Sequence, residues 1–234
     1  MTALYLYGVT RPRRLPRRFS ERGIGLVRAG DRAAIVSPVD ASSVQATRRN
    51  LLAHADVVEE LHAGAVVLPA RFGIVLPDRN AAKELLGSDE LARLLELHRD
   101  TAELTLKGSY DESVFGELAV GLSALREEYR RAPTLENGLA LGEAVAATLA
   151  DRRERDAARV LGELEPLALD VRASEPEGEH GALSLALLVR RGAVETVSAR
   201  LDLIAAELSP PLRFKLVGPL PPYSFVDLEL PVAA

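Results

Sequence analysis

The 234-residue chain contains no cysteine and no tryptophan, and aromatic residues make up only 4% of it. Without cysteine the protein can form no disulfide, thiolate metal site, iron–sulfur cluster or cysteine nucleophile. Five tyrosines and five phenylalanines are too few for an extended surface that stacks single-stranded nucleic acid. The composition therefore argues against several classes of redox, metal and nucleic-acid protein.

A long apolar run and an excess of positive charge are also missing. Stretches such as Leu183–Val189 fall far short of the roughly 20 apolar residues that a bilayer helix needs, and no basic region precedes the apolar N-terminus. The 29 lysines and arginines face 34 aspartates and glutamates, so the net charge is −5 and a whole-chain basic footprint for nucleic acid is absent. We expect a cytoplasmic protein with no membrane span and no nucleic-acid partner.

What remains is an ordinary globular composition, 47% apolar and 27% charged. The opening residues predict a covered strand, with Tyr5, Tyr7 and Val9 pointing to one face and Leu4 and Leu6 to the other. Because both faces are apolar, this strand is expected at the centre of a sheet.

Two more strands and a long helix are predicted next. The strands cover residues 23–28 and 33–39, on either side of a Gly30-Asp31 turn. The helix begins at Ser42 or Ser43 and ends near Ala63. Its apolar side recurs at helical spacing in Val44, Leu51, Ala55, Val58 and His62.

His54 lies on the apolar side of this helix, and Asn50 precedes it by one turn on the same face. A ligand or catalytic role is one interpretation of this histidine. A partly buried, hydrogen-bonded structural histidine is favoured, because no second ligand lies nearby at a usable spacing.

Residues 11–18 contain five arginines and two prolines, a composition that disfavours a helix or an interior strand. One interpretation is a basic arm for phosphate or an acidic partner. A solvated connecting loop is favoured.

An irregular apolar strand is predicted over Val66–Leu76, interrupted by Pro69 and Gly73. Proline in such a run indicates a sheet edge or a bulge, and glycine indicates a bend or a close backbone approach. Arg71 is the only charged residue in the run and would need a partner if it were buried.

The second half alternates strands and helices in a recognisable order. Residues 151–156 form a charged stretch, with Asp151/Arg155 and Arg152/Asp156 four apart, and a solvated helix face is the favoured interpretation. Short helices at 78–86 and 88–99 precede this half. Its predicted elements are a strand at 102–108, a helix from Asp111 through Tyr129, a helix over Leu135–Leu164, strands over Leu167–Ser174 and Leu183–Arg190, a helix through Leu208 and a strand at 212–216.

Apart from one extra helix, this order is the split βαβ, or ferredoxin-like, plan. The predicted fold class is therefore α+β, with two small domains that contain ferredoxin-like elements and inserted helices. We place the N-terminal domain at residues 1–105, the C-terminal domain with its long helices at 106–217, and a proline-rich tail at 218–234.

Sequence motifs for catalysis are absent. No phosphate-binding loop, dinucleotide-binding motif, nucleophile elbow or zinc-protease spacing occurs, and the four histidines are scattered. We therefore expect no enzyme activity, no catalytic residue, no metal site and no cofactor.

Four stretches taken together resemble the gas vesicle protein F/L (GvpL/GvpF) family, in order and across nearly the whole chain. The third, L-P-x-R-F-G, and the fourth, G-P-x-P-P-Y-S-F, are the specific ones. The stretches contain Tyr5 and Tyr7; Asn50 and His54; Pro69, Arg71, Phe72 and Gly73; and Gly218, Pro219, Pro221, Pro222, Tyr223 and Phe225.

This resemblance implies an accessory or structural protein of gas vesicle assembly, chaperone-like or a minor vesicle component. Its implied partners are the hydrophobic shell subunit and other accessory proteins, with no small molecule required, and its implied location is the vesicle or the cytoplasm. The implied fold is two α+β domains, the first a modified ferredoxin-like one. The motif residues are candidates for a protein-interaction surface, with Tyr223 and Phe225 as anchors on a polyproline-like tail. They also have a purely structural interpretation, in which Arg71 forms a buried ion pair and the tail packs across the domain interface.

The alternative function is a small-molecule-binding enzyme or sensor on a ferredoxin-like scaffold, in which Arg71 and His54 converge on an anion.

Overall fold

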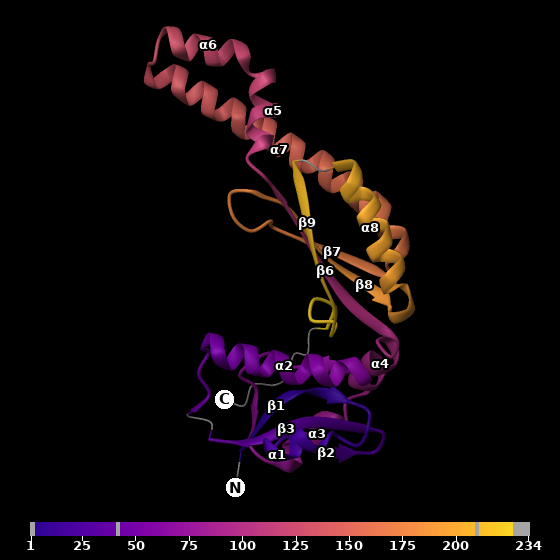
Figure 1. Ribbon diagram of the computed structural model, residues 1–234. Coiled ribbons are helices and arrows are strands. Elements are labelled where there is room, and N and C mark those ends of the chain that lie inside the picture. The colour runs from indigo at the N-terminus through magenta and orange to yellow at the C-terminus, as the bar shows by residue number, and fades with distance from the viewer. Residues whose placement is uncertain (1–2, 41–42, 209–210, 227–234) are drawn as a thin grey trace. The chain divides into compact units, whose positions relative to one another are not determined.

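The computed structural model of the protein describes residues 3–40, 43–208 and 211–226 (Figure 1). Internal contacts divide the chain into two compact units. The first contains Met1–Glu103 together with the segment that begins at Gly218, and the second contains Leu104–Val217. The division falls close to the boundary predicted after residue 105, and the segment predicted as a separate tail groups with the first unit.

The first unit is a five-stranded sheet with helices on both faces. Its elements are β1 (Ala3–Thr10), α1 (Arg17–Glu21), β2 (Gly25–Ala29), β3 (Arg32–Val39), α2 (Arg48–Gly64), β4 (Val67–Pro69), β5 (Val75–Leu76), α3 (Arg79–Leu86) and α4 (Asp89–Leu97).

Strand β1 is the centre of this sheet, as the sequence predicts. The order is β2-β3-β1-β4, and β5 also pairs with β1. β1 runs antiparallel to β3, β4 and β5. Helix α2 packs on one face through Val57, Val58 and Leu61, whereas α3 and α4 pack on the other through side chains such as Leu86 and Leu95.

A bulge in β1 changes which side chains share a face. The register against β3 shifts between Leu6 and Gly8, and an extra residue in a strand reverses the alternation beyond it. Val9 therefore packs in the same core cluster as Leu4 and Leu6, and the prediction that it would point with Tyr7 was wrong.

Helix α2 begins later than the sequence predicts. Thr47 caps it by accepting a hydrogen bond from the Asn50 backbone N–H (3.2 Å), whereas the Ser43 hydroxyl bonds the Asp40 carbonyl in the preceding turn. The other predicted cap, Ser42, lies outside the described residues. Leu51, which was predicted on the apolar side, is 45% exposed, and the buried residues of the helix begin at His54.

The arginine-rich residues 11–18 make contacts within their own unit. Arg11 pairs with Asp31 (3.1 Å) and Glu96 (2.7 Å), and Arg18 pairs with Glu60. The second proline does not prevent a helix, because α1 begins directly after Pro16, where proline is tolerated.

The described residues of the second unit form a four-stranded sheet, four α-helices and two 3₁₀ turns. Its elements are β6 (Thr101–Tyr110, which starts in the first unit), α5 (Ser113–Gly121), α6 (Ser123–Arg131), α7 (Leu135–Leu164), the 3₁₀ turn η2 (Glu165–Leu167), β7 (Asp170–Ser174), β8 (Gly181–Arg190), the 3₁₀ turn η3 (Arg191–Ala193), α8 (Val194–Leu208) and β9 (Leu212–Leu220).

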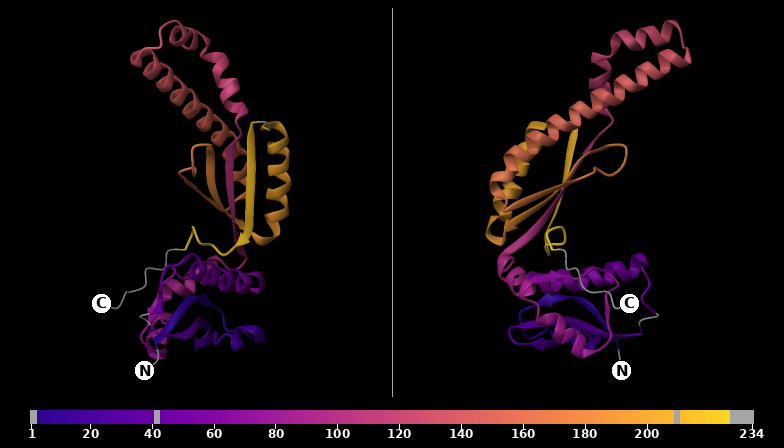
Figure 2. Two further views of the ribbon diagram at one scale, coloured as in Figure 1. Left: turned by 60° about the vertical axis from the view of Figure 1, so that its left-hand side comes forward. Right: turned by 180° about the vertical axis from the view of Figure 1, so that it is seen from behind.

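The sheet order of this unit is β7-β8-β6-β9. With two antiparallel sheets and helices, the chain is an α+β protein, as predicted. Helix α8 and the second half of α7 lie along the sheet, whereas α6 and the first half of α7 extend beyond its end (Figures 1 and 2). The core includes Val160 and Leu164 of α7 and Val197 and Leu201 of α8.

Two boundaries in this unit differ from prediction. The single helix expected from Asp111 through Tyr129 divides after Gly121 into α5 and α6. The strand expected at Leu167 begins at Asp170, because the 3₁₀ turn η2 precedes it.

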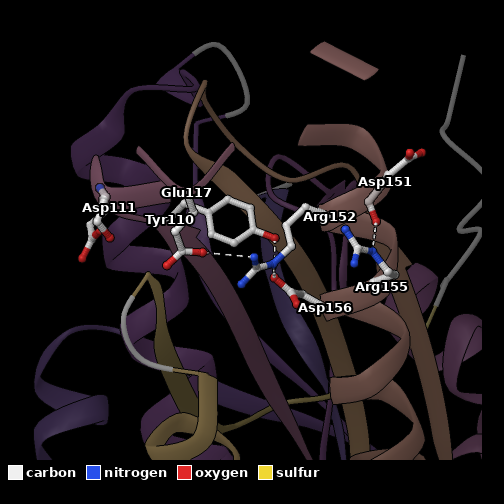
Figure 3. A network of polar contacts seen from close by, with 8 residues as sticks. Tyr110, Asp111, Glu117, Asp151, Arg152, Arg155 and Asp156 are labelled. Atoms are coloured by element: carbon white, nitrogen blue, oxygen red, sulfur yellow. Dashed lines mark hydrogen bonds and ion pairs between the residues drawn. The ribbon is translucent and has the colours of Figure 1, made fainter. Parts of the chain in front are cut away.

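The charged stretch of α7 contains a buried polar network, which corrects its interpretation as a solvated face (Figure 3). Asp156 is 7% exposed and accepts hydrogen bonds from the Tyr110 hydroxyl (2.7 Å) and Arg152 Nε (2.8 Å). Arg152 also reaches Glu117 (3.2 Å). Burial first, and then the bond to Asp156, raise the pKa of the Tyr110 hydroxyl.

We expect Asp156→Ala to lower the free energy of unfolding by about 2–4 kcal/mol, because it leaves a buried hydroxyl and a guanidinium without their acceptor. The control is Asp151→Ala on the same helix, whose carboxylate is exposed; we expect a change within about 0.5 kcal/mol. Denaturant unfolding followed by circular dichroism measures both. Equal effects would contradict the buried network.

Candidate functional site

Three of the four family-like stretches meet on the first unit, between β1 and α2. Tyr5 and Tyr7 come from β1, His54 from α2, and Phe72 from the connection between β4 and β5. Five pairs of these rings have centroids 4.9–5.9 Å apart, mostly edge to face. We call these four side chains the aromatic–histidine cluster.

His54 holds the cluster together through both ring nitrogens. Nε2 lies 3.1 Å from the Ala70 carbonyl oxygen, and a carbonyl oxygen only accepts, so Nε2 carries the proton. Nδ1 then accepts from the Tyr5 hydroxyl, 2.8 Å away. The same hydroxyl oxygen accepts from the Gly73 backbone N–H (3.3 Å). His54 is buried and hydrogen-bonded within the chain, as the favoured interpretation expects.

Burial favours the uncharged forms of His54 and Tyr5. It lowers the pKa of His54, against the bond to the Ala70 carbonyl, which favours the charged ring. Burial also raises the pKa of Tyr5 to about 12. With its one acceptor nitrogen already bonded to Tyr5, neutral His54 is badly placed to act as a general base.

At two glycines of the family-like stretches, the backbone conformation or its close surroundings disfavour any side chain. Gly73 has φ +94°, a conformation that side chains rarely adopt. A Cβ on Gly8 would lie 2.5 Å from the Leu68 carbonyl oxygen, so β1 and β4 approach closely only because position 8 lacks a side chain.

The other candidate residues of these stretches lie outside the cluster. Asn50 is exposed, and its side-chain amide donates to the Gln45 carbonyl (2.9 Å). Pro69 is buried in β4, at the sheet edge that the proline predicts. Arg71 is exposed, so the interpretation that placed it in a buried ion pair was wrong.

The fourth stretch packs within the first unit. β9 continues to Leu220 through a cis Gly218–Pro219 bond, and a turn follows, which corrects the expected polyproline-like segment. Pro221, Pro222 and Phe225 are buried, and Tyr223 packs against the core cluster that contains Phe19 and Val58.

Glu103 holds this segment in place through two hydrogen bonds, and the sequence analysis did not identify it. Its carboxylate accepts from the Ser224 backbone N–H (2.7 Å) and hydroxyl (2.8 Å), and it is 3% exposed. In the sequence Glu103 stands between Ala102 and Leu104, an alternation that is typical of a residue on the solvent face of a strand. No local signal identified the buried partner, which comes from residues 121 positions later.

A hollow of about 230 Å³ opens beside the aromatic–histidine cluster. Its lining combines aromatic, apolar and polar side chains, with Arg22 as its charged member among the described residues. The lining residues are Tyr5, Tyr7, Arg22, Ser37, Val39, Ser43, Val44, Asn50, Ala53, His54 and Phe72. Arg71 does not line it, so Arg71 and His54 do not converge there.

Comparison with known proteins identifies the family. The model of the gas vesicle synthesis protein GvpL/GvpF family matches residues 3–227. The chain belongs to the GvpL/GvpF family. Gas vesicle protein F of Streptomyces sp. (strain CB03234) is 34% identical, with 95% of this chain and 99% of that protein covered. Gas vesicle protein F of Dolichospermum flosaquae is 24% identical, with 97% and 98% covered.

Solved GvpF structures have the same fold. The crystal structure of GvpF from Anabaena sp. PCC7120 matches with a TM-score of 0.81 at 23% identity, covering 98% of this chain and all of that one. GvpF from Microcystis aeruginosa matches with a TM-score of 0.77 at 22% identity, covering 97% and 100%. The family gives the chain a role in gas vesicle formation.

None of the helices in the described residues combines the length and apolar character that a membrane crossing requires. Within the same residues, no group of three or more histidines, aspartates and glutamates is arranged to hold a metal ion.

The buried His54 predicts a pH dependence of stability. Its folded-state pKa is lowered, so below the unfolded-state value of about 6.5 the unfolded chain binds more protons and stability falls. We expect His54→Gln, which cannot titrate, to reduce the stability lost between pH 7.5 and 5.5 by up to about 1 kcal/mol. Denaturant unfolding at several pH values measures this.

His180→Gln is the control, because it removes an exposed histidine from the second unit. A pH profile that changes as much in this control as in His54→Gln would contradict the role given to His54.

Proposed function

We propose that the protein is a non-catalytic assembly factor that binds the small apolar shell subunit, or another vesicle protein, while gas vesicles form in the cytoplasm. Its role as chaperone or minor vesicle component then depends on how long it holds that partner. The observation that carries the proposal is an apolar helix face in the second unit that is exposed to solvent.

This face lies on the first half of α7. Leu135, Leu139, Gly142 and Ala146 follow one another at steps of four, three and four residues and therefore share one side of the helix. All four are exposed, Leu135 by 80% and Leu139 by 58%. Val120, at the end of α5, is 77% exposed. We call the four α7 residues the α7 face.

The α7 face is suited to close packing by another helix. A Cβ on Gly142 would meet nothing within 4 Å, so the backbone there is open to an approaching partner. Residues 135–150 contain only two charges, Glu136 and Glu143. The first half of α7 also extends beyond the sheet of its own unit (Figure 2). Contiguous apolar surface of this kind is typical of protein-binding sites.

The alternative, a small-molecule enzyme or sensor using Arg71 and His54, has less support. The two residues do not line one hollow, and both nitrogens of His54 are bonded within the protein. The volume of about 230 Å³ is also below the roughly 300–1,000 Å³ of typical small-molecule sites.

We also infer that the second unit has a ferredoxin-like plan. Apart from the extra helices, β6, β7, β8 and β9 follow the order of a split βαβ unit in sequence. The sheet order β7-β8-β6-β9, with the first and third strands of the unit at the centre, supports this inference. Because such a scaffold serves many functions, it gives no argument about activity.

Co-expression with the shell subunit tests the proposed function. We expect the tagged protein to retain the shell subunit in the soluble fraction. Leu139→Glu should lower the retained amount roughly tenfold, equivalent to about 1.4 kcal/mol of binding free energy, because a charge would replace apolar contact. Quantitative pull-down followed by mass spectrometry measures the retained subunit.

The matched control is Leu203→Glu on α8, a leucine of the same unit that is also 58% exposed. It should leave retention unchanged. No retention by the unmodified protein would refute the shell subunit as partner, and equal losses in both variants would refute the α7 face.

A further inference from the structure

The hollow beside the aromatic–histidine cluster is a second candidate contact, on the first unit. We propose that it anchors a short acidic segment of a partner protein, with one apolar side chain inserted against Tyr7 and Phe72 and a neighbouring carboxylate on Arg22. The inference rests on the proposed function and deepens it, because it adds a site of different chemistry from the α7 face.

The size of the hollow matches a side chain better than a cofactor. Its volume of about 230 Å³ lies below the range of roughly 300–1,000 Å³ for small-molecule sites. Tyr7 and Phe72 are only partly buried, and Asn50 and Ala53 at its rim are exposed. A side chain can therefore enter from solvent and contact aromatic rings, as anchor residues do at protein interfaces.

The charge of the hollow indicates an acidic ligand. Its described lining includes Arg22 and no aspartate or glutamate. Among the arginines that precede it, Arg11, Arg17 and Arg18 each pair with a carboxylate of their own unit, and Arg13 donates to the Leu61 carbonyl. Within the described residues no such ion pair joins Arg22, although the chain carries five more acidic than basic residues. Charge complementarity therefore favours a carboxylate from outside.

Asn50 of α2 adds to this chemistry. Asn50 donates its amide to Gln45, and its side-chain oxygen can accept a backbone N–H. The hollow therefore offers an apolar contact, a cation and a hydrogen-bond acceptor. These match the apolar side chain, the carboxylate and the backbone N–H of a peptide segment.

A fluorescence anisotropy experiment with the purified full-length protein tests this site. The probe is a labelled, capped peptide of sequence Gly-Asp-Leu-Asp-Gly-Ser, and the reference peptides replace both aspartates by lysine or the leucine by serine. We expect saturable binding of the aspartate–leucine peptide and at least roughly tenfold weaker binding of each reference peptide, about 1.4 kcal/mol.

Two variants and a matched control locate the binding. Ala53→Phe fills the mouth of the hollow and should weaken peptide binding at least tenfold, or about 1.4 kcal/mol. Arg22→Glu should reverse the preference toward the lysine peptide. Ala63→Phe places the same ring on an exposed alanine of the last turn of α2 and should bind like the unmodified protein. Circular dichroism and denaturant unfolding verify that each variant is folded.

The outcomes separate this site from the proposed function. Absence of saturable binding at millimolar peptide, equal binding of the aspartate and lysine peptides, or equal effects of Ala53→Phe and Ala63→Phe would overturn the site. If the shell subunit is nevertheless retained in the co-expression experiment, the proposed function stands without it. Peptide binding with no retention of the shell subunit would leave the site and overturn the shell subunit as partner.

Discussion

The first unit depends on one side chain that bonds two separate parts of the sheet. His54 reaches Tyr5 on the central strand through Nδ1 and the Ala70 carbonyl, just beyond the edge strand, through Nε2. A neutral ring with one proton satisfies both partners at once. The Tyr5 hydroxyl in turn accepts from the Gly73 N–H. The irregular connection between β4 and β5 is thereby fixed by polar contacts, where regular strand pairing is interrupted.

The long amphipathic helices were predictable because the spacing of apolar residues within each segment is enough to specify a helix. The sequence predicts α7 over Leu135–Leu164, as observed. In α8 the apolar residues Val197, Leu201 and Ile204 recur at helical spacing, and all three are buried. In these segments local periodicity and tertiary packing agree, so no information from distant residues is needed.

Where prediction was wrong, a distant partner or a local irregularity decided the outcome. Val9 changed face because of a bulge that alternation cannot reveal. Asp156 and Glu103 look like surface carboxylates in sequence but are buried, because Tyr110 and Ser224 supply donors from other elements. The convergence of Tyr5, His54 and Phe72 likewise required the fold, although each had been singled out as part of a family-like stretch.

The family-like stretches and the α7 face are different residues, and this has a physical basis. Tyr5, His54 and Phe225 are largely buried and bonded or packed within the chain, so their side chains have little capacity left for a partner. The α7 face has the opposite character: it adds nothing to the core of its own unit and leaves apolar surface in water. Exposed apolar surface adds little to folding stability, whereas covering it by a partner is favourable. Burial of Tyr5, His54 and Phe225 therefore explains how these residues can mark the fold of the family, while we propose that the shell subunit binds the α7 face, outside the family-like stretches.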